Sequence, residues 1–75
     1  MGIVNTEVAS WAVETRLMCA RHDVRQVEIA RRLGCSEQYV SQVLRADLRP
    51  IPISERQRGR IGQAIQEILE ERACQ

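Results

Sequence analysis

The apolar residues between positions 26 and 33 follow the period of a helix. Their spacings include i, i+3 and i+4, which places them on one buried face: Val27, Ile29, Ala30 and Leu33. Gly34 then ends the helix, because a residue that enters the left-handed region after a helix is cheapest as glycine. Ser36 can cap the next helix by accepting a backbone N–H bond. The pattern therefore predicts two helices, 26–33 and 37–45, joined by a very tight turn.

The second of these helices has two different sides. Val40, Val43 and Leu44 fall together and predict its buried face. Hydrogen-bonding side chains stand opposite, at i, i+3, i+4 and i+7: Gln38, Ser41, Gln42 and Arg45. We expect this helix to pack through one face and to present a strip of polar groups on the other.

A longer apolar pattern precedes this pair and predicts a helix over residues 5–20. Asn5 or Thr6 can cap it, with Glu7 near its positive end. Two adjacent stripes are apolar, the first made of Val8, Trp11, Ala12, Thr15, Met18 and Cys19, the second of Ala9, Val13 and Leu17. These stripes cover more of the circumference than one neighbour needs. The helix is therefore either well buried, with Trp11 as a core anchor, or partly in contact with a partner.

Two prolines bar a continuing helix over residues 45–53 and predict a loop there. Ser54 can cap a last helix over residues 55–71. The apolar stripe of that helix is Ile61, Ala64, Ile65, Ile68 and Leu69. Gly59 and Gly62 weaken the helix by about 1 kcal/mol each relative to alanine, so we expect them to mark close backbone packing.

The predicted fold class is all-α: four main helices in a small bundle of four to five helices, with no β-sheet, in one domain over residues 1–75. Phenylalanine is absent, and tryptophan and tyrosine occur once each, so valine, isoleucine, leucine and alanine must build the core. A chain of 75 residues is near the size at which one core supplies only a few kcal/mol. Oligomerisation is therefore expected.

The net charge of +1 hides an uneven distribution. Residues 21–60 carry nine arginines against five acids, whereas both flanks are acidic. A solvated surface with chance clustering is one explanation; phosphate contact is the other, and the coincidence with the paired helices favours it. The chain has no lysine, which suits phosphate and guanine recognition but is as readily explained by a GC-rich genome.

No enzyme or metal site is expected. The cysteines at 19, 35 and 74 lack CxxC spacing, and the single histidine cannot complete a zinc site. The sequence contains no Ser/His/Asp or Cys/His constellation and no glycine-rich phosphate loop, so no cofactor is expected either. Without a membrane span or a signal peptide, the expected location is the cytoplasm, with the cysteines reduced.

Three sets of residues match a known motif. Ala30 stands where two crossing helices need a small residue, Gly34 stands at the turn, and the interlocking apolar positions are Ile29, Leu33, Val40 and Val43. With the runs Gly-Cys-Ser, Tyr-Val-Ser-Gln-Val-Leu and Ile-Ser-Glu-Arg-Gln-Arg-Gly-Arg-Ile, they resemble the helix-turn-helix domain of the phage repressor and Cro (lambda repressor-like) family and of the lactose-repressor family, over roughly residues 24–69. The chain departs from that pattern at Cys35 and at Arg25, where these families usually have a capping Thr or Ser. Asp23 is the alternative cap.

The resemblance implies binding to double-stranded DNA through the motif at residues 26–45. A recognition helix points its N-terminal part at base edges, so the candidate base-reading residues are Glu37, Gln38, Ser41 and Gln42. Glu37 has an alternative role, which is to complement the helix dipole. The candidate phosphate-binding residues include four at the edges of the motif, Arg25, Gln26, Arg45 and Arg49, and two within it, Ser36 and Tyr39.

Two functions remain in competition. The first is a transcriptional regulator, a small bacterial or phage repressor of the Cro type, that acts as a homodimer on an inverted repeat with recognition helices about 34 Å apart. The second is an antitoxin or adaptor that uses the same fold to hold a protein. The ligand-binding domain of the lactose-repressor family has no counterpart in the sequence, so no small-molecule effector is expected. The dimer interface is left open between the first and the last helix.

Overall fold

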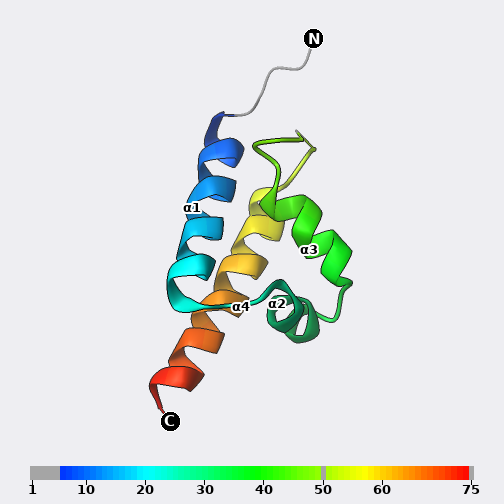
Figure 1. Ribbon diagram of the computed structural model, residues 1–75. Helices are drawn as coiled ribbons and strands as arrows, with labels where there is room; N and C mark the ends of the chain where they lie inside the picture. Colours follow the sequence, from blue (N-terminus) through cyan, green and yellow to red (C-terminus); the bar gives the residue numbers. More distant parts are fainter. Residues whose placement is uncertain (1–5, 50, 75) are drawn as a thin grey trace.

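The computed structural model describes residues 6–49 and 51–74. It contains four helices, α1 (Thr6–His22), α2 (Gln26–Leu33), α3 (Glu37–Leu44) and α4 (Glu55–Ala73), and no strand among the described residues (Figure 1). The predicted all-helical fold is confirmed. Helix α2 has the predicted bounds, and the C-terminal ends of α1, α3 and α4 differ from prediction by one or two residues. The proposed cap Asn5 lies outside the described residues.

The long helices α1 and α4 pack on each other, α3 packs on α1, α2 packs on α4, and the two short helices pack on each other (Figure 1). All four helices and the loop before α4 contribute to one core, and its largest fully buried side chains are Ile29, Val40, Val43, Leu44 and Ile61. Trp11 lies half-buried at the edge of this core. The predicted stripes of α3 and α4 are buried, except that Leu69 is half-buried.

The apolar surface of α1 is used only in part. Its buried face is centred on Val8, Ala12, Thr15 and Cys19. The buried Thr15 hydroxyl donates a hydrogen bond to the Trp11 carbonyl at 2.6 Å. Met18 was predicted on the buried stripe, but it lies at the edge of that face and is 43% exposed. The second stripe also faces outward at Val13 and Leu17. The sequence left two alternatives for α1, namely burial within the bundle or contact of one side with a partner. Burial is wrong for the side that carries Val13 and Leu17.

Helix α2 lies between two chain reversals of the same kind. Gly34 has a φ of 71°, as predicted, and the Cys35 N–H donates to the Ala30 carbonyl at 3.0 Å. Asp23 has a φ of 54°, and the Val24 N–H donates to the Cys19 carbonyl at 2.8 Å. In both cases a left-handed residue lets the next N–H reach back to the last turn of the preceding helix.

Asp23 therefore ends α1. The alternative prediction, in which Asp23 caps α2, is wrong. The residue before α2 is Arg25, which has no side-chain acceptor for the helix N-terminus. Instead the Arg25 N–H donates to Glu28 Oε2 at 2.8 Å, so the carboxylate three residues on supplies one half of a capping box.

Serines cap α3 and α4 as predicted. Ser36 Oγ accepts from the Tyr39 N–H at 3.1 Å, and Ser54 Oγ accepts from the Gln57 N–H at 3.1 Å. The two glycines of α4 do not mark close packing. A Cβ added at Gly59 or Gly62 would meet no atom within 4 Å, because both positions face open space.

Candidate nucleic-acid interface

The outward side of α3 is uncovered and continues into the loop that follows. Gln38, Gln42 and Arg45 are exposed and Ser41 is half-buried. With three loop residues they line an open groove, named the α3 groove here: Gln38, Ser41, Gln42, Arg45, Leu48, Arg49 and Ile51. Five of the ten residues selected from sequence as base or phosphate contacts thus lie together.

Glu37 is exposed in the first turn of α3 but does not line the groove. Arg25 and Gln26 lie at the start of α2, also outside it. Ser36 and Tyr39 lie at the N-terminus of α3, where the Ser36 hydroxyl oxygen is already bonded to the Tyr39 amide. That bond leaves the hydroxyl proton of Ser36 available to a further acceptor.

Gln57 orients the Tyr39 hydroxyl, a role that no sequence pattern indicates. The Oε1 atom of Gln57 accepts from the Ser54 N–H at 2.8 Å, and its Nε2 atom donates to the Tyr39 hydroxyl oxygen at 2.9 Å. Because the amide can only donate at Nε2, the phenol accepts this bond and keeps its own proton for another partner. A cap of α4 thereby leaves Tyr39 as a donor beside the N-terminus of α3.

Leu48 and Ile51 were not selected from sequence. They are 69% and 38% exposed, and they sit in the groove beside Arg45 and Arg49. The sequence does contain a signal that could identify them: each is an apolar residue in a predicted loop, where no helical pattern assigns it to a buried face. Apolar side chains next to glutamines suit a surface that meets thymine methyl groups or an apolar protein segment.

Arg16 of α1 fixes the end of α3. Its Nη1 atom donates to the Leu44 carbonyl at 3.0 Å, and the guanidinium also forms a two-pronged pair with Asp47, with Nη2 to Oδ2 at 3.0 Å. The Arg16 hydrogen bond lowers the pKa of Asp47 despite its partial desolvation. The last turn of α3 and the start of the loop are therefore tied to α1 across the core, which holds the groove in shape.

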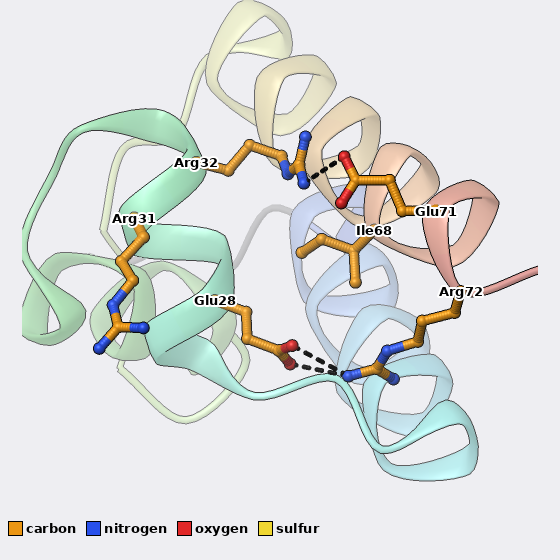
Figure 2. Close-up of a pocket in the computed structure, with 6 residues that line it drawn as sticks. All are labelled: Glu28, Arg31, Arg32, Ile68, Glu71 and Arg72. Carbon is orange, nitrogen blue, oxygen red and sulfur yellow. Dashed lines mark hydrogen bonds and ion pairs between the residues drawn. The ribbon is translucent and has the colours of Figure 1, made fainter. Parts of the chain in front are cut away.

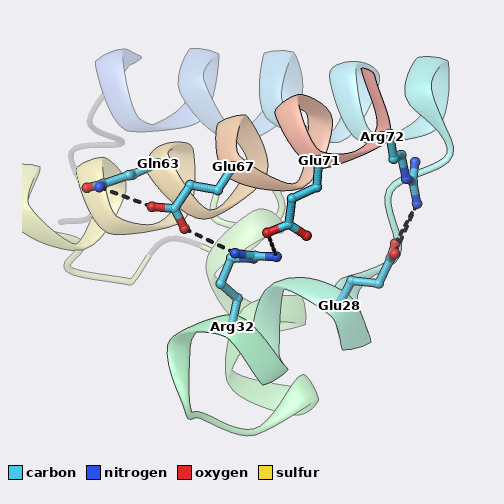
Figure 3. A network of polar contacts seen from close by, with 6 residues as sticks. All are labelled: Glu28, Arg32, Gln63, Glu67, Glu71 and Arg72. Carbon is cyan, nitrogen blue, oxygen red and sulfur yellow. Dashed lines mark hydrogen bonds and ion pairs between the residues drawn. The ribbon is translucent and has the colours of Figure 1, made fainter. Parts of the chain in front are cut away.

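A second arginine-rich region lies between α2 and α4, where acids meet the arginines. Arg32 donates to Glu71 at 2.6 Å and to Glu67 at 3.4 Å. Arg72 donates to both oxygens of Glu28 at 3.0 Å and to the His22 carbonyl at 2.6 Å. Figure 3 shows the contacts between these arginines and carboxylates as a row along the two helices; Glu28, Arg32, Glu67, Glu71 and Arg72 together are named the α2–α4 seam.

Two carboxylates line the pocket at this seam, and they pair with two of its three arginines. Ile68 lies between the two ion pairs, whereas Arg31 points away from them on the outer side of α2 (Figure 2). The pKa of Glu28 is lowered, first by the hydrogen bond from the Arg25 backbone and then by Arg72. The seam therefore joins helices and offers no excess positive charge.

Ion pairing redistributes the charge found in the sequence. Glu28 and Asp47 are neutralised by Arg72 and Arg16, which lie outside residues 21–60. Eight arginines have no acid partner in the described part of the chain: Arg21, Arg25, Arg31, Arg45, Arg49, Arg56, Arg58 and Arg60. All eight belong to residues 21–60, so the positive excess of that segment remains on the surface.

The described residues contain no group of three or more His, Cys, Asp or Glu side chains arranged to hold a metal ion. None of their helices combines the length and the apolar character needed to span a membrane. Burial raises the pKa of the Cys19 thiol, which makes that sulfur a poor nucleophile.

Comparisons with protein-family models, curated proteins and solved structures found no match to this chain.

Proposed function

We propose that this protein binds double-stranded DNA sequence-specifically and regulates transcription, with residues 26–45 acting as a helix-turn-helix of the phage repressor and Cro type. The observation that carries the proposal is the α3 groove. A strip of glutamine and serine side chains lines the groove together with two arginines that form no ion pair within the described residues. Such a surface combines groups that read base edges with groups that hold phosphates.

Within this proposal the residues divide their work by position. Gln38, Ser41 and Gln42 read bases, since an amide can bond adenine at two points. Arg45 and Arg49 flank them and bind phosphates, joined at the edges of the motif by donors at the starts of α2 and α3: Arg25, Gln26, Ser36 and Tyr39. Glu37 either accepts from cytosine or stabilises the N-terminus of α3.

Two copies are needed for useful selectivity, because one recognition helix buries too little surface to select a site in a genome. We propose a homodimer on an inverted repeat, with its α3 helices about 34 Å apart in successive major grooves. Such a repressor would act on DNA in the cytoplasm of a bacterial cell.

The test is selection from random duplexes with the purified protein, followed by binding to the recovered site across a salt series. The expected result is an inverted repeat, bound with an affinity that falls steeply with salt as phosphate contacts release counterions. No enrichment, together with no DNA retention at low salt, would contradict the proposal.

One observation favours the alternative function, an antitoxin or adaptor. Leu48 and Ile51 expose apolar surface in the groove, as a protein-binding site does. In that case the purified protein would retain no DNA at low salt and would carry a partner whose binding is lost in Leu48→Gln.

A further inference from the structure

The outer face of α1 exposes more apolar surface than the outer face of any other helix in the described part of the chain. Val13 is 37% exposed, Leu17 58% and Met18 43%. Val13 and Leu17 are four residues apart and thus adjacent on the helix surface, whereas Met18 lies about 100° further round the helix, at the edge of the buried face. The other large exposed apolar side chains, Leu48 and Ile51, lie in the loop before α4.

Two opposite charges stand beside this apolar strip. Glu14 and Arg21 are both exposed, and neither forms an ion pair within the described residues. They are seven residues apart, which places them on the same side of the strip, about 10 Å from each other along the helix axis. They are too far apart to pair within one chain.

We infer that the outer face of α1, comprising Val13, Glu14, Leu17, Met18 and Arg21, binds the same face of a second copy in antiparallel orientation. A two-fold axis near Leu17 and Met18 places Leu17 against the partner strip. The same operation brings Glu14 of each copy beside Arg21 of the other, because residues on one side of an antiparallel helix pair meet their own kind. The inference rests on the proposed function, which calls for two copies without assigning the surface.

Charge decides against the other arrangements. A parallel pairing of α1 places the Glu14 and Arg21 side of one copy on the opposite edge of the interface from that side of the other copy, so neither Glu14–Arg21 attraction forms. Pairing through Leu48 and Ile51 brings Arg45 and Arg49 of one copy toward those of the other. Like charges that meet at an interface cost binding energy.

The outer side of α4 offers no comparable strip, since its large apolar side chains face the core and its exposed positions are polar, glycine or alanine apart from the terminal Cys74. Helix α1, in contrast, packs on α3 through its opposite, buried face. Helices α1 and α3 flank the core in Figure 1. A partner on the outer face of α1 therefore leaves the α3 groove of both copies uncovered.

Charge exchange tests this surface. Sedimentation equilibrium, in reducing buffer because Cys74 is exposed, compares wild type with Glu14→Arg, Arg21→Glu and the double variant. Each single variant should weaken dimerisation about threefold to tenfold, because two attractions become two repulsions, and the double variant should restore it to within about twofold. Single variants that dimerise like wild type, or a double variant no better than either, would overturn the inference.

Leu17→Gln and Leu48→Gln form a matched pair for the apolar part. Leu17→Gln should weaken dimerisation about tenfold or more, since the two-fold axis removes the side chain twice, while Leu48→Gln should leave it unchanged. The reverse outcome would place the interface at the loop. All four α1 variants change exposed residues, and circular dichroism verifies that each is folded.

Failure of this inference is separable from failure of the proposed function. If DNA is selected and bound while the α1 variants leave self-association unaltered, the function stands and the surface is wrong. If the α1 variants behave as expected and no duplex is ever bound, the surface stands and the function is wrong.

Discussion

Two regions of this protein are rich in arginine, and they differ in what surrounds the guanidinium groups. In the α2–α4 seam, Arg32 and Arg72 donate to carboxylates at 2.6 to 3.4 Å. In the α3 groove, Arg45 and Arg49 have no acid partner within the described residues and flank a strip of glutamines. Arginine content alone therefore does not distinguish the two regions; the difference is whether acids from another helix pair with the arginines.

The largest difference between the regions should appear in sequence selectivity. Gln42→Ala in the groove should cost about 1–3 kcal/mol on the selected site and relax its base preference at one or two positions. Gln66→Ala on the outer side of α4 is the matched control and should change neither. Titrations with selected and scrambled duplexes measure the effect, and equal losses on both duplexes would remove base reading from this face.

Phosphate binding should separate the two kinds of arginine. Arg49→Ala should weaken binding to all duplexes alike and lower the slope of log affinity against log salt by about one unit, because one counterion-releasing contact is lost. Arg32→Ala removes the same charge from the seam and should leave the slope unchanged. If both variants lower it equally, the distinction between free and paired arginines has no bearing on DNA binding.

The seam should instead contribute to stability in a pH-dependent way. The pKa of Glu28 is lowered in the folded protein from its ordinary 4.5, because the Arg25 N–H and Arg72 favour the carboxylate. The unfolded chain therefore binds the proton more readily, so this stabilisation is present above the ordinary pKa and is lost as pH falls through the lowered one.

Urea unfolding between about pH 7 and pH 2.5 measures this dependence. Glu28→Gln should flatten the acid side of the stability profile relative to wild type. Asp47→Asn should do likewise at the other end of the core, because Arg16 lowers the pKa of Asp47 in the same sense. Profiles that superimpose on that of wild type would show that these pairs contribute nothing.

The smallest expected effect concerns a glycine of α4 that belongs to neither region. Gly62→Ala should raise stability by about 1 kcal/mol, because the helix gains propensity and the added methyl group enters open space. DNA affinity should remain the same. Thermal unfolding and a duplex titration measure both quantities, and a loss of stability would mean that the position is crowded after all.

Local signals were sufficient for most of the helix ends. Gly34, Ser36 and Ser54 act as predicted because each effect depends on residues within one turn. The start of α2 was ambiguous between Asp23 and Arg25 since two polar residues stood near it, and only the backbone shows that Asp23 closes α1. Gly59 and Gly62 were misinterpreted because sequence does not tell whether a helix position faces a neighbour or open space.

Local patterns in the sequence were enough to predict the four helices, the serine caps of α3 and α4 and the side of α3 that carries polar groups, because helical period and capping are short-range properties. They placed five candidate contacts on one surface since Gln38, Ser41, Gln42, Arg45 and Arg49 are close along the chain. The packing of the helices shows three further things: Arg16 holds the end of α3, Gln57 orients Tyr39, and Arg32 and Arg72 are neutralised. These contacts join residues 18 to 44 positions apart, and their existence depends on how the helices pack, which no local pattern encodes.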